Sequence, residues 1–118
     1  MSQVNAKWVL DEVDRTFPNS CTAAEKRHWL AQAEAFAAHA VGLSAPAEPM
    51  GDDTRLMVPV PYNNLYCRYV EAQMAYALGE MSRYNNAVAA WNELLLTWRD
   101  HCARGGETPQ RVTALKLC

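Results

Sequence analysis

Apolar residues recur with helical spacing through the second half of the chain, from Val58 to Cys102. They follow one another at alternating steps of four and three, as in Val70, Met74, Ala77, Met81, Tyr84, Val88, Trp91, Leu95, Trp98 and Cys102. Residues three and four apart lie on one face of an α-helix. Polar residues such as Glu71 and Arg83 fall on the other faces. The spacing therefore predicts amphipathic helix along this stretch.

Gly79 divides the apolar stretch near its middle. One unbroken helix of this length would span about 60 Å at 1.5 Å per residue, which is long for so short a chain. Glycine costs about 1 kcal/mol relative to alanine inside a helix but is well suited to a C-terminal cap. Ser82, Asn85 and Asn86 could begin a second helix, because their side chains accept hydrogen bonds from free backbone N–H groups. We therefore predict a long helical hairpin over residues 62–103 that turns near Gly79 to Ser82; a single helix is the alternative.

The first predicted helix runs from Val4 to Arg15. Its apolar side consists of Val4, Trp8, Val9 and Val13. Pro18 ends it, because the residue before a proline is pushed out of helical geometry.

A second predicted helix starts after Thr22 and extends to about Val41. Thr22 and Glu25 have the spacing of a capping box, in which hydroxyl and carboxylate each bond the other residue's backbone N–H. Gly42 is a good terminator. The residues expected to line its buried side are Trp29, Leu30, Ala33, Phe36, Ala37 and Ala40.

Residues 42–61 are predicted to form a long extended loop. The segment holds four prolines, two glycines and the acidic pair Asp52–Asp53. Compact domains rarely carry so long a loop without a purpose. Leu56, Val58 and Val60 alternate with other residues, so this part either forms a short edge strand or lies extended before the next helix.

The C-terminal residues 105–118 are predicted to form an extended arm that begins with the glycine pair Gly105-Gly106. This divides the chain into a helical domain, residues 1–104, and the arm. The arm mixes β-branched, aliphatic and basic residues and is too short to fold alone. It looks like a segment that adds a strand to the sheet of a partner; a disordered or self-docked tail is the alternative.

Composition limits the classes of function. The 118 residues suffice for one domain, and the formal net charge of −2 comes from interspersed acids and bases. There is no basic stripe typical of nucleic-acid binders and no apolar run long enough to cross a membrane. The N-terminus lacks the pattern of a secretory signal, so the four widely spaced cysteines are expected to be reduced thiols. Cys67 and Cys102 fall on apolar helical faces and are expected in the core.

Residues that could carry out chemistry are scattered. His28, His39 and His101 lie in separate segments without metal-ligand spacing. No nucleophile motif, glycine-rich phosphate loop or carboxylate pair at a catalytic spacing is present. The sequence therefore predicts no catalytic residues, no cofactor and no metal, and a protein that is not an enzyme.

One stretch resembles the second helix of a tetratricopeptide repeat. It comprises Tyr84, Ala87, Trp91, Leu94 and Leu95, in which small and large residues alternate. This resemblance implies a small helical scaffold, which would bind a peptide through the tyrosine-rich residues 62–76.

A broader resemblance covers residues 9–103. Its pieces, in order, are Asp11-Glu12-Val13, Pro18-Asn19, Glu25-Lys26, Trp29-Leu30, Leu56 through Tyr62, Leu65-Tyr66, Glu71-Ala72-Gln73, Gly79-Glu80 and Tyr84-Asn85-Asn86. As a set they resemble a family of small proteins of tailed phages and prophages, encoded between the major capsid protein and the tail genes.

This second resemblance implies an all-α fold of about four helices and a structural role in the virion neck. A head–tail connector (adaptor) of this kind forms a ring of about twelve copies beneath the portal protein, and DNA passes through the ring without specific binding. Its expected partners are the portal, neighbouring copies and tail or head-closure proteins. Assembly in the host cytoplasm and no membrane contact are also implied. A phage regulator directed at the host is a third possibility.

Two sets of residues are expected to carry the connector role. Contact with the portal is assigned to the arm residues Arg111, Val112, Leu115, Lys116 and Leu117. Packing between the helices is assigned to Trp29, Phe36, Tyr69, Tyr84, Trp91 and Trp98.

Overall fold

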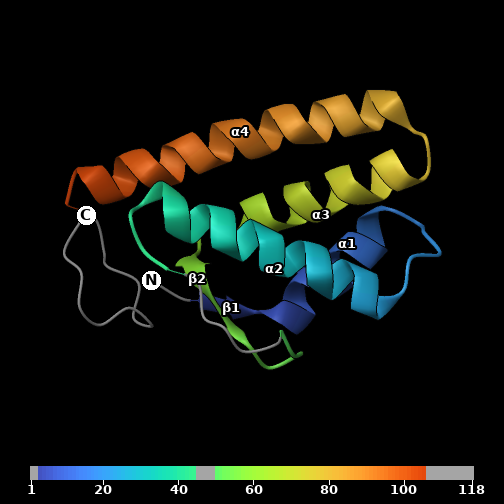
Figure 1. Cartoon of the computed structure of the whole chain (residues 1–118), viewed down its shortest axis with the longest axis horizontal. Helices are drawn as coiled ribbons and strands as arrows, with labels where there is room; N and C mark the ends of the chain where they lie inside the picture. Colours follow the sequence, from blue (N-terminus) through green and yellow to red (C-terminus); the bar gives the residue numbers. More distant parts are fainter. Residues whose placement is uncertain (1–2, 45–49, 106–118) are drawn as a thin grey trace.

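The computed structural model describes residues 3–44 and 50–105, and the predicted hairpin is present in it. Helix α3 (Asn64–Ala77) and helix α4 (Met81–Ala103) run antiparallel (Figure 1). Gly79, at φ 77°, ends α3: its N–H donates to the carbonyl of Tyr76, and that of Glu80 donates to Ala75. This Schellman arrangement satisfies the last carbonyls of the helix and requires a left-handed residue, which glycine adopts without strain.

The start of α4 differs from the prediction. It begins at Met81 after Glu80, which makes no side-chain cap, and Ser82, Asn85 and Asn86 lie inside the helix. The tight glycine turn brings the chain back so quickly that no residue remains for a separate cap. Asn63 stands at the N-cap position of α3 without a side-chain cap bond.

The first two helices follow their predicted signals. Helix α1 (Ala6–Thr16) ends before Pro18, and helix α2 (Ala23–Ala40) begins after Thr22. Both capping-box bonds are formed, from Glu25 N to Thr22 Oγ1 (3.0 Å) and from Thr22 N to Glu25 Oε1 (2.9 Å). The capping box is therefore confirmed.

The fold is mostly helical, but it is not strictly all-α as predicted. Strand β1 (Gln3–Asn5) pairs antiparallel with strand β2 (Arg55–Pro59), with Gln3 opposite Pro59. Val4 therefore lies in a strand and not in the first helix. The helix starts after its N-cap residue Asn5, whose side-chain oxygen accepts a hydrogen bond from Trp8 N. The pairing joins residues about fifty positions apart, so no local pattern could show it.

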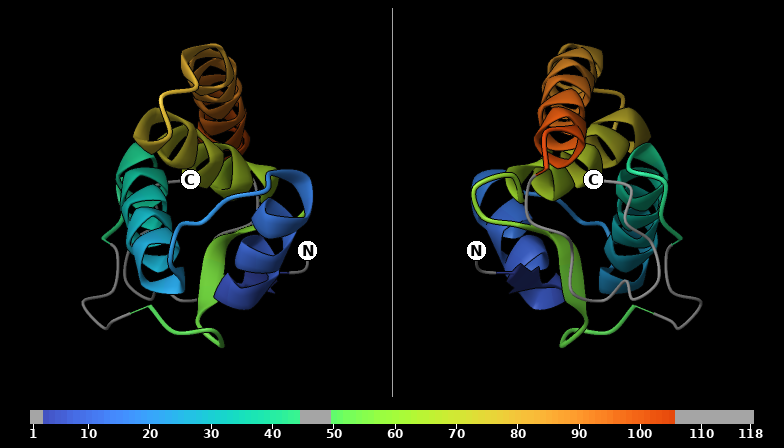
Figure 2. Two further views of the ribbon diagram at one scale, coloured as in Figure 1. Left: turned by 90° about the vertical axis from the view of Figure 1, so that its right-hand side faces the viewer. Right: turned by 90° about the vertical axis from the view of Figure 1, so that its left-hand side faces the viewer.

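The core lies where α1, α2 and β2 meet α3. Figure 2 shows α3 between α4 on one side and α1 and α2 on the other. The largest fully buried side chains of the core are Trp98, Tyr66, Leu30, Leu56, Met57, Leu65, Met74, Glu34, Val9, Val13, Val58 and Val70. Part of the loop predicted at residues 42–61 thus belongs to the core, and Cys67 and Cys102 are buried as expected.

The apolar stripe is not buried along its whole length. Met81 is 46% exposed, because it lies at the hairpin turn, beyond the region that α1 and α2 cover. Phe36, expected on the buried side of α2, is 52% exposed, and that expectation is wrong. A residue at the edge of the apolar face of a helix can be buried or exposed. The packing of neighbouring elements decides which of the two occurs.

Candidate functional site

The predicted portal-contact residues lie outside the described residues. Arg111, Val112, Leu115, Lys116 and Leu117 all belong to this part of the chain.

Three of the predicted packing residues, Phe36, Tyr69 and Trp91, form an aromatic row. The ring of Tyr69 lies 5.9 Å from that of Phe36 and 5.0 Å from that of Trp91, so the row joins α2, α3 and α4. The hydroxyl of Tyr69 donates to Gln32 Oε1 (2.9 Å), and burial, followed by nearby Tyr84, raises the pKa of Tyr69. The row stiffens the three helices and leaves one side of Phe36 exposed.

The other three predicted packing residues lie in different surroundings. Trp98 is fully buried, whereas Trp29 and Tyr84 are half-buried. The ring of Tyr84 lies 5.3 Å from that of Tyr76, which ties the start of α4 to the end of α3.

Three large apolar side chains are exposed around the hairpin turn, and we name them the hairpin tip. Tyr76 is 62% exposed, Leu78 is 42% and Met81 is 46%. Apolar residues gathered at one exposed place mark a protein-contact surface more often than singly scattered ones do. Of these three residues only Met81 belongs to the apolar stripe, so the spacing along the chain did not mark this surface.

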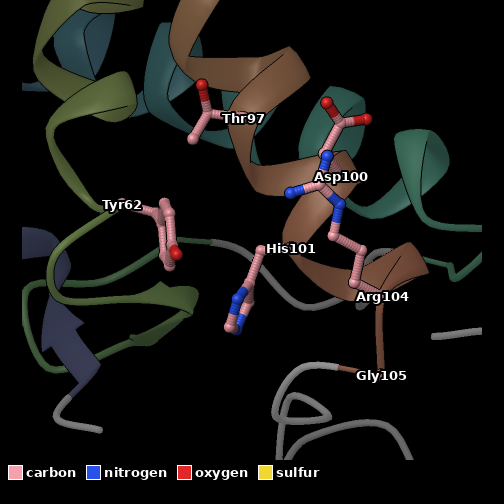
Figure 3. A pocket seen from close by; sticks show the side chains of 6 residues that line it. All are labelled: Tyr62, Thr97, Asp100, His101, Arg104 and Gly105. Carbon is pink, nitrogen blue, oxygen red and sulfur yellow. The ribbon is translucent and has the colours of Figure 1, made fainter.

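A pocket of about 310 Å³ opens at the C-terminal end of α4. It is lined by Tyr62, which precedes α3, and by Thr97, Asp100, His101, Arg104 and Gly105 of the last turns of α4 and its end (Figure 3). The rings of Tyr62 and His101 stack with their centres 4.8 Å apart. The sequence did not point to this pocket, because its two segments are separated by the whole of the hairpin.

Two buried polar atoms in the last turns of α4 have no hydrogen-bond partner in the described part of the chain. They are Trp98 Nε1 and His101 Nε2. Buried polar atoms nearly always have a partner, whether protein or water. The indole N–H of Trp98 can only donate a hydrogen bond.

Within residues 3–44 and 50–105, no three His, Cys, Asp or Glu side chains are grouped so that they could hold a metal ion. Burial, ahead of the charge of Glu12, raises the pKa of Cys67 to about 12, which keeps this thiol protonated and unreactive. In the same part of the chain, no helix combines the length and apolar character needed to cross a bilayer.

Comparison with known proteins gave no match, whether against family models, curated proteins or solved structures.

Proposed function

We propose that this protein is a structural subunit of a virion neck, a head–tail connector that forms a ring and docks on the portal. The proposal extends the sequence resemblance described above. Its mechanism is assembly: a rigid body contacts neighbouring copies, and an arm reaches the next component.

The hairpin tip is the observation that carries the proposal. Three large apolar side chains stand at the end of a capped helical hairpin, where their exposure to water is unfavourable unless a partner covers them. Further exposed apolar residues come from separate elements: Trp8, Phe36 and Leu96. A ring subunit needs at least two different contact faces, because its contacts are heterologous.

The C-terminal pocket offers a second candidate contact surface. Gly105, at φ 84°, lies on its rim. A docking polypeptide could contact the polar side chains that line this pocket, such as Asp100 and Arg104. The arm and the pocket would then contact the portal together.

The alternative, a tetratricopeptide-like peptide-binding scaffold, has less support. It needs the tyrosines of residues 62–76 to face a ligand. The hydroxyl of Tyr66 is buried and bonded to Glu34, that of Tyr69 is bonded to Gln32, and the ring of Tyr62 stacks on His101. Tyr76 is the one tyrosine of this segment that is more than half exposed.

Truncation after Gly105 tests the proposal. We expect the truncated chain to keep the circular dichroism spectrum of the full chain but to lose binding to purified portal in a pull-down. A variant with Leu78→Ser and Met81→Ser should weaken self-association, whereas Ala89→Ser on an exposed face of α4 should not.

Three results would contradict parts of the proposal. Portal binding by the truncated chain would show that the arm assignment is wrong. Unchanged self-association of the Leu78→Ser, Met81→Ser variant would remove the hairpin tip from the contacts. A full chain that stays monomeric beside the portal in light scattering, and binds short peptides, would favour the scaffold.

A further inference from the structure

A polar groove of about 490 Å³ lies between α3 and α4, away from the C-terminal pocket. It is lined by Arg68, Glu71, Arg83, Asn86, Ala87 and Ala90, and we name it the arginine groove. The alanines leave room above the helix, so the groove is open to an approaching side chain.

The two arginines of this groove are held in place but not neutralised. Glu71 is shared between them, with Oε1 2.9 Å from Arg68 Nη1 and Oε2 3.4 Å from Arg83 Nε. The guanidinium carbon of Arg83 also lies 3.9 Å from the ring centre of Phe17. One carboxylate between two guanidiniums leaves a net positive charge, and Arg83 keeps both terminal nitrogens without an acceptor among the described residues. A fixed guanidinium with spare N–H groups is well arranged to bind a carboxylate.

A rigid acidic turn lies elsewhere on the same chain. Residues 51–54 form a turn closed by bonds from Thr54 N to Gly51 O (3.0 Å) and from Gly51 N to Thr54 Oγ1 (2.9 Å). Backbone bonds from Ala6 N and Lys7 N tie this turn to the start of α1. Asp53 is exposed on the turn and has no ion-pair partner in the described part of the chain, whereas Asp52 lies 3.4 Å from Arg27.

The groove and the turn lie at opposite ends of one helix. The turn is bonded at Ala6, the first residue of α1, and Arg83 stacks on Phe17, the residue after its last. The 11 residues of α1 separate the two ends by about 16 Å at 1.5 Å per residue. In Figure 1 the turn lies at the lower edge of the molecule and the start of α4 lies at the upper right. Asp53 therefore cannot reach the groove of its own chain.

We infer that the arginine groove of one copy binds Asp53 of the next copy. Asp53 and the arginines of the groove have opposite charge and lie on different sides of the subunit, and the turn that carries Asp53 and the two arginines are each held by hydrogen bonds or ion pairs of their own chain, so the contact is head-to-tail. Repetition of such a contact closes into a ring when the rotation per copy permits. The inference rests on the proposed function, because it names the contact through which the copies of a ring would meet.

Charge reversal of the full-length protein tests this contact. Self-association is measured by analytical ultracentrifugation and native mass spectrometry, alone and with purified portal. We expect Asp53→Arg and Arg83→Glu each to weaken association about tenfold or more, because like charges then meet across the contact. The double variant D53R/R83E should recover most of the association, since the charges again have opposite sign. Added salt should weaken the wild-type contact.

Matched controls make the same two kinds of charge reversal at positions of α4 that lie outside the proposed contact. Glu93→Arg and Arg99→Glu reverse exposed charges outside the groove and should associate like the wild type. Circular dichroism checks that each variant folds, and Asp53→Arg changes an exposed turn residue, so it tests the contact even if Arg83→Glu is unstable.

The outcomes separate this contact from the proposed function. If Asp53→Arg assembles like the wild type, the contact is wrong and the ring stands. If Arg83→Glu weakens assembly but Asp53→Arg does not, the groove binds a different acidic partner, and the inference is overturned. If the wild type never self-associates, even with portal, both the contact and the proposed ring are wrong.

Discussion

Tyr66 and Glu34 form a hydrogen bond of 2.5 Å in the core, from the Tyr66 hydroxyl to Glu34 Oε1. Glu34 is 2% exposed, and its second oxygen accepts from Met57 N (2.9 Å). The hydroxyl oxygen of Tyr66 accepts in turn from Val58 N (2.8 Å). Through these bonds, α2 and α3 satisfy two backbone N–H groups of β2, which a two-stranded sheet leaves without a neighbouring strand.

We expect Tyr66→Phe to destabilise the protein by about 1–3 kcal/mol, because Val58 N–H and Glu34 Oε1 each lose a buried partner. Denaturant unfolding followed by circular dichroism measures the change. Tyr69→Phe is the matched control, since its hydroxyl bonds a partly buried glutamine and should cost less. Equal effects of the two substitutions would show that the network does not hold β2.

Gly79→Ala should destabilise the hairpin by about 1–2 kcal/mol, because an L-residue is strained at a φ of 77°. A Cβ at this position meets nothing within 4 Å, so strain alone is tested. Gly51→Ala serves as the control: its φ is not positive, and its Cβ would make an ordinary 3.8 Å contact with Thr54 Oγ1. Thermal unfolding compares them, and a Gly79→Ala protein as stable as the wild type would contradict the cap assignment.

Cys67 should resist alkylation in the native protein. Burial raises its pKa to about 12, whereas an unfolded cysteine titrates near about 8.5. Its contribution to stability is therefore complete below about pH 8.5 and is lost as the pH rises toward 12. Iodoacetamide labelling read by mass spectrometry at about pH 8 should modify the partly exposed Cys21 before Cys67. Fast labelling of Cys67 in the folded chain would contradict this burial.

The ion pair of Lys26 with Asp14 should make stability fall in acid. Burial raises the pKa of Asp14, but hydrogen bonds from Lys26 and Asn19 and the charge of Lys26 outweigh it, so this pKa lies below its ordinary value. The stabilisation is present above the unfolded pKa of about 3.9 and is lost as the pH falls through the folded value.

Lys26→Met tests this pair, because Lys26 is buried at 6% exposure and methionine has a similar length. Its unfolding free energy should depend less on pH below about pH 4 than that of the wild type. Lys7→Met, which breaks an exposed pair with Asp11, is the control. Parallel pH curves for Lys26→Met and the wild type would exclude the pair as a source of the acid dependence.

Local signals in the sequence determined where the first three helices end and where α2 begins. The Thr22–Glu25 capping box, Pro18, Gly42 and Gly79 act through bonds or steric limits within a few residues. Each could therefore be predicted without knowledge of the fold. The start of α4 was not predicted correctly. Gly79 and Glu80 form the C-terminal cap of α3, so α4 begins directly after them, at Met81.

Long-range contacts decided the rest. Strand β1 exists only because β2 lies beside it, and Phe36 is exposed because no helix or strand among residues 3–44 and 50–105 covers that side of α2. The arginine groove joins Phe17 with α3 and α4, and the C-terminal pocket joins residue 62 with residues 97–105. Periodicity specifies which face of a helix is apolar, but the partner that buries that face comes from distant parts of the chain. The helices of this protein were thus fixed by neighbours in sequence, and its surfaces by neighbours in space.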